Sequence, residues 1–438
     1  MDSCSYFTDF KDVNFNYLGD KADMAVIKPF KALRPAKQSA DKVASVPYDV
    51  VSTEEAKEIA EGNPLSFLRV TRSELEIDIN TDPYSPEVYT KAKENLEKLI
   101  KSAPLQVDDK EHIYIYRLIM NGRPQVGIAA TFSVDDYDNN VILKHEKTRK
   151  VKEDDRTNHI VTTGAQTGAV FLTYKGVVLI NRIVDYTIKN IEPLYDFTSP
   201  DGITHTVWML PDENNRSIIN EMAKVKNLYI ADGHHRAASA SRARAVKKDS
   251  NPNHTGKEDY NFFLAVLFPA EQLKILPYNR VVFDLNVKSK DEFLSEVGEK
   301  FILDKSNIKE PQQINSYGMY LDGEWYMLLA RESITASNSL SKSVAETLDV
   351  SILQDFLLNP ILGIDDPRTN KRIDFIGGIR GTKELEKLVN SGKAKVAFSL
   401  YPVSINDLIK ISDAGEIMPP KSTWFEPKLR DGLLVHLI

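Results

Sequence analysis

The sequence predicts an α/β fold of the mixed α+β type, and three patterns support this prediction. Runs rich in β-branched and aromatic residues, at 112–120, 125–134 and 260–270, are typical of strands. Apolar residues at helical spacing within 83–103 predict a helix. The apolar run 228–231 leads at once into an Ala- and Arg-rich stretch, as at a strand-to-helix junction. Strands and helices that alternate along a chain indicate this class of fold.

The N-terminal part contains a polar segment, a short strand and a capped helix. Residues 1–23 have no apolar periodicity, so we expect an extension there. Residues 24–30 form a short apolar run that a proline ends, which predicts a strand. Ser52 or Thr53 can cap the helix that follows. Glu55, three residues after Ser52, completes a capping-box pattern, and a Gly-Asn-Pro sequence ends the helix.

The middle and C-terminal parts add further strands and helices. The Asn-Gly dipeptide at 121–122, between two apolar runs, predicts a hairpin. We expect 168–174 and 176–184 to form another strand pair and 273–283 to contain strand as well. Helices and strands then alternate again, which places a boundary near 285–290.

The composition is that of an ordinary globular protein with a modest excess of acid. The 438 residues include 27% charged and 42% hydrophobic residues, and the formal net charge is −7 at pH 7. This charge argues against a broad nucleic-acid-binding surface. Cys4 is the single cysteine, which excludes a disulfide framework or a cysteine-based zinc site within one chain. We find neither a membrane-spanning apolar run nor a signal peptide, so we expect a soluble cytoplasmic protein with no membrane partner. The sequence leaves the oligomeric state open.

The segment Asp232-Gly233-His234-His235-Arg236 is the main candidate site. A strand that ends here and opens a helix directs backbone N–H groups and the positive end of the helix dipole into one space, which favours an anion. Gly233 lets the backbone approach a ligand or take a positive φ. Arg236 can bind phosphate oxygens, one imidazole can move a proton near neutral pH, and Asp232 could hold a metal ion or orient a histidine. Adjacent helical side chains diverge by about 100°, so the two histidines are predicted to have different roles. The alternative is a capped helix whose histidines simply pack.

A second candidate is the charged stretch 143–160, which contains the sequence His-Glu-x-Thr. Such runs are usually solvated helix faces or loops, and this interpretation stays open. However, Glu146 comes soon after the apolar run 141–143, and catalytic groups are often presented from strand ends and loops. Glu146 as general base, Asp155 as an Mg²⁺ ligand and Arg156 as a phosphate ligand would suit phosphoryl transfer.

Two other segments add candidate ligands. Asp49, in VPYDVVS, could ligate a metal or a substrate amine, whereas the dipole of the following helix already explains Glu54 and Glu55. In MPPKSTWFEPKL, a rigid Pro-Pro pair precedes Lys421, which could complete an anion site from a distant part of the chain. The alternative for this motif is a proline-shaped turn followed by ordinary core aromatics.

Several common enzyme motifs are absent from the sequence. It contains no P-loop, no G-x-G-x-x-G motif and no protein-kinase signature set. The histidines show no H-E-x-x-H spacing, which argues against a hydrolytic zinc site.

The motifs resemble those of known families. Gly-x-His-Arg after a strand resembles the phosphate motif of the ParB/sulfiredoxin-like nucleotide-binding fold, and the fuller Asp-Gly-His-His-Arg form resembles its free-serine-kinase branch. From Met24 to Ile438 the sequence resembles an uncharacterised group, domain-of-unknown-function family 1015. Five separated motifs carry this resemblance in order: IKPFKALRP, VPYDVVS, HEKT with EDDR, ADGHHR and MPPKSTWFEPKL. Sulfiredoxin chemistry needs a cysteine where this chain has His234, and the helix-turn-helix of ParB proteins is missing.

The resemblance implies a nucleotide-dependent phosphotransferase that acts on a small hydroxyl metabolite, with free L-serine as the first acceptor to consider. Residues 233–236 would hold the transferring phosphate, together with Asp232, Arg156 and Lys421 as cofactor ligands. Asp49 or Glu146 would take the hydroxyl proton. His234 or His235 would stabilise or protonate the group in transit. ATP or ADP would be the cofactor, and Mg²⁺ would bridge phosphate oxygens with Asp155 as its candidate ligand.

The resemblance also implies a division of the chain. Residues 24–72 and 226–285 would form the ParB/sulfiredoxin-like core, and 73–225 a large, mainly β insertion. Residues 286–438 would form a C-terminal α/β portion that returns MPPKST to the same cleft.

Two other functions stay open. A nucleotide-sensing regulatory protein would use the same phosphate site without phosphoryl transfer. A DNA-bound partition-like factor would show affinity that falls steeply with salt. The many carboxylates and cations of the motifs, beyond what nucleotide binding alone requires, favour the transferase.

Overall fold

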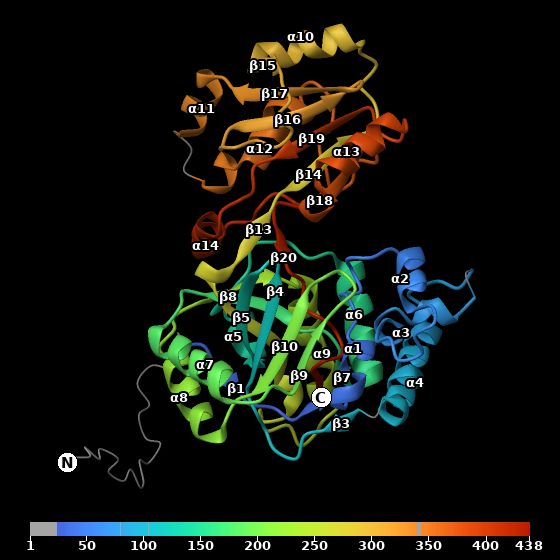
Figure 1. Ribbon diagram of the computed structural model, residues 1–438, viewed down its shortest axis with the longest axis vertical. Helices are drawn as coiled ribbons and strands as arrows, with labels where there is room; N and C mark the ends of the chain where they lie inside the picture. The colour runs from blue at the N-terminus through green and yellow to red at the C-terminus, as the bar shows by residue number, and fades with distance from the viewer. Residues whose placement is uncertain (1–23, 79, 104, 340–342) are drawn as a thin grey trace, which may run out of the picture.

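The computed structural model describes residues 24–438, except 79, 104 and 340–342 (Figure 1). The expected extension 1–23, with Cys4, lies outside the described residues. Figure 1 shows a lower body, which contains the nine-stranded sheet, and an upper body, which contains the six-stranded sheet. Helices and strands alternate along the chain in both bodies, which confirms the predicted mixed α+β class. No helix in the described part of the chain is long and apolar enough to cross a bilayer.

The lower body is built on a nine-stranded mixed sheet. Its order is β6-β11-β8-β12-β5-β4-β10-β9, with β1 paired to β5. The strands are β1 (Ile27–Lys28), β4 (Tyr114–Met120), β5 (Arg123–Ser133), β6 (Ile142–Leu143), β8 (Val170–Tyr174), β9 (Tyr195–Thr198), β10 (Thr204–Met209), β11 (Leu228–Asp232) and β12 (Phe262–Pro269). Strands β11 and β12, from 226–285, therefore lie between β6, β8 and β5, from 73–225, whereas the neighbours β5, β4, β10 and β9 all come from 73–225.

The hairpin between β4 and β5 forms at the predicted Asn-Gly turn. Met120 pairs with Arg123, so the connection is a two-residue loop. Asn121 and Gly122 have φ values of 52° and 74°. Positive φ at both central residues matches the twist of the two strands, which explains why local sequence predicts this hairpin.

Helices cover the sheet (Figure 1). They are α1 (Ala40–Val43), α2 (Thr53–Ala60), α3 (Leu68–Thr71), α4 (Pro86–Ser102), α5 (Val134–Asp138), α6 (Lys150–Thr163), α7 (Val178–Asn190), α8 (Asp212–Met222) and α9 (His234–Asp249). The helices α2, α3 and α4 lie at one side of the lower body (Figure 1). The helix α6 packs between α4 and α9. The capping box at α2 is confirmed, because Ser52 Oγ accepts the Glu55 N–H at 3.1 Å and Glu55 Oε2 accepts the Ser52 N–H at 2.8 Å.

The prediction of a strand at 176–184 is wrong, because this segment begins helix α7. Ile180, Val184 and Thr187 are buried at a spacing of four and three residues. Val178 and Tyr186 lie on the opposite side and are exposed. A short apolar run fits either periodicity, and the buried face is set by the rest of the fold.

A small sheet brings the two ends of the described chain together. Its order is β3-β2-β21-β7, and the strands are β2 (Ala32–Arg34), β3 (Gln106–Val107), β7 (Ala165–Gln166) and β21 (Val435–Leu437). Leu33 of β2 pairs with Val435 of β21, and Ser45 forms a bridge with Asp431. The C-terminal segment therefore lies beside the segment that carries Asp49.

The upper body contains a six-stranded sheet of order β15-β17-β16-β19-β14-β18 (Figure 1). Its strands are β14 (Tyr278–Val282), β15 (Phe301–Lys305), β16 (Ser316–Leu321), β17 (Glu324–Ala330), β18 (Ile373–Gly377) and β19 (Val396–Leu400). Its helices are α10 (Lys290–Lys300), α11 (Glu332–Ser339), α12 (Asp349–Leu353), α13 (Gly381–Asn390) and α14 (Ile405–Asp413).

A two-stranded ribbon of β13 (Lys274–Leu276) and β20 (Trp424–Glu426) joins the two bodies (Figure 1). Phe425 of β20 is buried, and its ring lies 5.5 Å from that of Phe171 in β8. Aromatic packing of this kind fixes the ribbon to the main sheet. The motif MPPKSTWFEPKL is therefore held at the boundary between the bodies.

Candidate functional site

The turn between β11 and α9 requires glycine. Gly233 has φ 89° and ψ 30°, in the left-handed region that side chains with Cβ avoid. An added Cβ would meet its nearest atoms only at 3.5 Å, so backbone conformation is the constraint. The N-cap residue of α9 is Gly233, which has no side chain to accept a hydrogen bond from the first turn. The first N–H groups of a helix also have no acceptor within the helix. This end of α9 keeps the anion-attracting character that the sequence predicts.

Asp232 is fixed at this turn. Its Oδ1 accepts the Gly233 N–H at 2.8 Å, and its Oδ2 accepts from Lys428 Nζ at 2.6 Å. Burial alone would raise the pKa of Asp232, but Lys428, Arg236 and the Gly233 N–H together lower it well below its ordinary value. Asp232 is therefore a permanent negative charge near neutral pH and not a proton carrier.

His234 and His235 both bind the loop after β6. Nε2 of His234 accepts the His145 N–H at 3.4 Å, and Nε2 of His235 accepts the Arg149 N–H at 3.0 Å. A ring nitrogen that accepts carries no proton, so each neutral ring has its proton on Nδ1. Burial lowers the pKa of both rings, that of His234 to about 4. The two histidines thus fasten the His-Glu-x-Thr loop to α9 at two different points.

This loop carries Glu146 to the turn. Glu146 Oε2 lies 3.7 Å from Nδ1 of His234. The side chain is 43% exposed, yet partial loss of water raises the pKa of Glu146, against the opposing effect of Lys421. A carboxylate with raised proton affinity at the edge of a pocket has the property of a general base.

A pocket of about 70 Å³ opens among these groups. Its walls carry three carboxylates and two lysines: Asp49, Glu146, Asp232, Lys421 and Lys428. Tyr278 and Trp424 form an aromatic wall, with ring centroids 5.1 Å apart. The volume is enough for several waters or a small polar group.

The MPPKST segment closes one side of this pocket. The Met418 N–H donates to the carbonyl of His145 at 2.8 Å, which holds the segment against the His-Glu-x-Thr loop. Lys421 has φ 56°, is exposed and points its Nζ to within 3.4 Å of the Tyr278 hydroxyl. Lys421, from the C-terminal motif MPPKSTWFEPKL, therefore lines the pocket at the β11–α9 turn.

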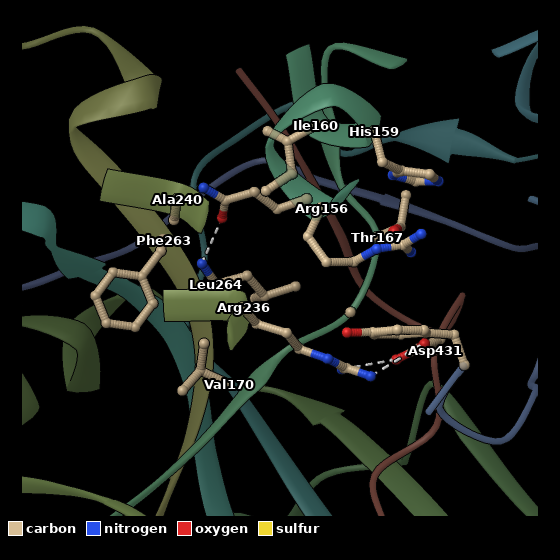
Figure 2. A pocket seen from close by; sticks show the side chains of 13 residues that line it. Arg156, His159, Ile160, Thr167, Val170, Arg236, Ala240, Phe263, Leu264 and Asp431 are labelled. Carbon is tan, nitrogen blue, oxygen red and sulfur yellow. Dashed lines mark hydrogen bonds and ion pairs between the residues drawn. The ribbon is translucent and has the colours of Figure 1, made fainter. Parts of the chain in front are cut away.

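Arg236 points toward Asp431 and lines an internal cavity (Figure 2). Its Nη1 donates to Asp431 Oδ1 at 3.1 Å and to the Ala169 carbonyl at 3.0 Å. Its Nη2 lies 3.8 Å from Asp49 Oδ1. Burial opposes the charge, but Asp431 and Asp49 raise the pKa of Arg236 above its ordinary value. Arg236 thus has a buried counterion in Asp431. It approaches the pocket of about 70 Å³ through its contact with Asp49.

The internal cavity has room for water but not for a nucleoside. Its volume is about 30 Å³. The ring of Tyr48 lies 4.2 Å from the guanidinium of Arg156 and 5.5 Å from that of Arg236. Arg156 also lines this cavity.

Asp155 does not fit the predicted role of Mg²⁺ ligand. Arg156 donates to both of its carboxylate oxygens, at 3.0 and 3.1 Å, and the Tyr89 hydroxyl donates to Oδ1 at 3.1 Å. Among the residues that the structure describes, no group of three or more His, Cys, Asp or Glu side chains is placed to hold a metal ion. We therefore assign no step to a metal.

The structure gathers most of the predicted residues around one turn and separates two of them. Those at the turn or its pocket are Asp49, Glu146, Asp232, Gly233, His234, His235, Arg236 and Lys421. Asp155 and Arg156 lie beside the internal cavity instead. Sequence reasoning missed Lys428, Asp431 and Tyr48. Lys428 and Tyr48 belong to quoted motifs, whereas nothing in the local sequence distinguishes Asp431.

Comparison with models of known protein families shows to which family this chain belongs. A family model described as a protein of unknown function, DUF1015, matches residues 27–351. The chain belongs to the DUF1015 family. The motif-based resemblance is thereby confirmed, while the ParB/sulfiredoxin-like core stays a prediction. No curated protein matches this DUF1015 chain.

Solved structures give only distant similarities to this DUF1015 protein. A conserved hypothetical protein from Pyrococcus furiosus is 11% identical, with a TM-score of 0.33, over 71% of this chain and 95% of that one. A free serine kinase in complex with AMP is 11% identical, with a TM-score of 0.32, over 70% and 91%. A C-terminally truncated SbnI from Staphylococcus aureus is 12% identical, with a TM-score of 0.37, over 70% and 87%. At these TM-scores the similarities carry no functional weight.

Proposed function

We propose that this protein is a nucleotide-dependent phosphotransferase that acts on a small hydroxyl metabolite, with free L-serine as the first acceptor to test. One observation carries the proposal. The β11–α9 turn, three carboxylates and two lysines meet around a single pocket, although they come from four distant segments of the chain. Phosphoryl transfer needs a base for the acceptor and positive charge for the phosphate, and this pocket offers both.

The cationic side chains around the β11–α9 turn differ in whether they form an ion pair with a carboxylate. Lys421 is exposed and has no carboxylate ion pair among the described residues. Lys428 is paired with Asp232, and Arg236 with Asp431. Lys421 and the N-terminus of α9 would therefore bind the phosphate first, and Arg236 would contribute from the side of Asp49.

Two carboxylates can serve as the base. Glu146 has a raised pKa, and its Oε2 lies 3.7 Å from Nδ1 of His234. Asp49 is 49% exposed and lies on the side of Arg236. Either would take the hydroxyl proton as the acceptor oxygen attacks the terminal phosphorus and the bond to the leaving nucleotide oxygen breaks.

The histidines would act mainly through Glu146. Both rings use Nε2 to hold the backbone of the His-Glu-x-Thr loop. In this role His234 and His235 are positioning residues, and neither needs to carry a proton to the phosphate.

The experiment is a product assay with the full chain. ATP or ADP, Mg²⁺ and L-serine are incubated with the protein, and phosphoserine is measured by ³¹P nuclear magnetic resonance and mass spectrometry. Product that depends on both nucleotide and serine supports the proposal. Saturable nucleotide binding without any phosphorylated product, across serine and other small hydroxy compounds, would replace it with the nucleotide-sensing function.

A further inference from the structure

A larger pocket lies on the other side of the MPPKST segment. Its volume is about 730 Å³, within the range of small-molecule sites. Met418 and Pro419 line both this pocket and the smaller one at the β11–α9 turn. The other walls come from Lys147, from β14, from 343–355, from 365–368 and from the rest of 416–420. We call it the upper pocket.

Arg280 is a buried cation at the wall of the upper pocket. Its residue exposure is 3%, and its guanidinium lies 4.8 Å from the ring of Phe375. It donates to the carbonyls of Tyr278 and Pro420. No carboxylate in the described part of the chain forms an ion pair with it, and burial lowers its pKa to about 9. A buried charge without a counterion is costly, so a ligand anion at Arg280 would be stabilising.

Asp355 presents the opposite charge to the same pocket. Its side chain is exposed and makes no hydrogen bond or ion pair with any described residue. It lies in the π-helical turn Gln354–Leu358, next to α12. Partial loss of water and the nearby Glu346 raise the pKa of Asp355. A ligand cation near Asp355 would therefore also be favourable.

Several other charged side chains of the upper pocket have partners of their own. Asp366 pairs with Arg368 at 3.3 Å. Glu416 accepts from the Ser343 hydroxyl at 2.8 Å. Of the five carboxylates that line the pocket, Asp355 is the one without a partner among the described residues. Of the three cations, Arg280 and Lys147 form no ion pair with a described carboxylate, and of these two only Arg280 is buried.

The charge of the lining also disfavours a polyphosphate as the main occupant. Five carboxylates face the pocket, against three cationic side chains. This excess of negative charge disfavours a nucleotide and favours a ligand with one anionic and one cationic end.

We propose that the upper pocket binds a small zwitterion larger than a free amino acid, with its carboxylate on Arg280 and its ammonium group on Asp355. A dipeptide carries both charges, one at each end, and is small enough for the volume of the pocket. This inference does not depend on phosphoryl transfer, because binding here needs neither nucleotide nor turnover.

The probes are glycyl-L-serine, its C-terminal amide and its N-acetyl form, titrated calorimetrically into the full chain without nucleotide. We expect saturable binding of the dipeptide. Each neutralised analogue should bind at least tenfold more weakly, because it loses a hydrogen bond between charged groups, and tenfold corresponds to about 1.4 kcal/mol. Absence of dipeptide binding at millimolar concentration, or equal affinity for all three compounds, would overturn the proposal.

Variants assign each end of the ligand. Arg280→Gln should lose discrimination between the dipeptide and its amide, while Arg280→Lys should retain part of it. Asp355→Asn should lose discrimination between the dipeptide and its N-acetyl form. Asp304→Asn, an exposed change on β15, is the matched control and should bind like the parent. Because Asp355 is exposed, we expect Asp355→Asn to fold. This variant therefore tests the position of the ligand's ammonium group even if Arg280→Gln fails to fold. Retained discrimination in Asp355→Asn contradicts the assignment.

Discussion

The Nζ of Lys428 lies 2.6 Å from Oδ2 of Asp232, across 196 residues of sequence. This ion pair joins the C-terminal motif to the β11–α9 turn. It exists because β20 and β21 return the end of the chain to the lower body, where β21 pairs with β2. The pair makes Asp232 a permanent charge and holds Lys428 over the ring of Trp424, 4.7 Å away.

Replacement of Lys428 tests this pair. Lys428→Met should reduce the free energy of unfolding by about 1 kcal/mol at pH 7, since the pair is hydrogen-bonded but Asp232 is partly exposed. The lowered pKa of Asp232 means that this contribution is present above about pH 4, the unfolded value, and is lost as pH falls below it. Urea unfolding at several pH values measures the difference. Lys248→Met, an exposed change near the end of α9, should leave stability unchanged.

Arg236→Ala should affect both stability and ligand binding. Asp431 would be left buried without its counterion, which should cost about 3–5 kcal/mol of unfolding free energy. Nucleotide binding should weaken by about 1.5–3 kcal/mol. Adding Asp431→Asn should restore much of the stability but not the binding, as measured by thermal melting and titration calorimetry. If the double variant binds nucleotide like the parent, Arg236 has only a structural role.

Local signals in the sequence predicted the parts of this fold whose causes are local. The Asn-Gly hairpin and the capping box at Ser52 depend on neighbours within a few residues, and both are present. The segment 176–184 was different, because its apolar run fits a strand or a helix and only packing against the sheet decides between them. Local periodicity therefore could not identify α7.

The candidate site shows the same limit. Asp49, Glu146 and Lys421 each belong to a motif that the sequence alone identifies, and the structure brings them to one pocket. Asp431 could not be found, because its role depends on a β-bridge to Ser45 and on contact with Arg236. The backbone contacts of the two histidines also require the path of the loop, which no spacing in the sequence reveals.

Glu146→Gln and Asp49→Asn distinguish the two possible bases. The residue that takes the hydroxyl proton should lose about 10²- to 10⁴-fold in turnover when it is replaced, with nucleotide affinity nearly unchanged. The other should lose much less. Steady-state rates of phosphoserine formation and nucleotide titrations provide both values. Glu299→Gln, on the exposed side of α10 in the upper body, is the matched control. Parent-like turnover in both variants would remove these carboxylates from the chemistry.

The neutral ring of His234 should make the protein sensitive to acid. Its folded pKa is about 4, below the unfolded value of about 6.5, so the unfolded chain binds more protons between these values. Stability should therefore be full above about pH 6.5 and fall as pH decreases toward 4. His234→Gln can still accept the His145 N–H through its amide oxygen but cannot titrate, so its stability should fall less steeply over the same range. Urea unfolding at pH 7, 6, 5 and 4.5 gives the two slopes. Equal slopes in parent and variant would show that His234 is not a buried neutral ring, and the proposed fastening of the His-Glu-x-Thr loop would lose its basis.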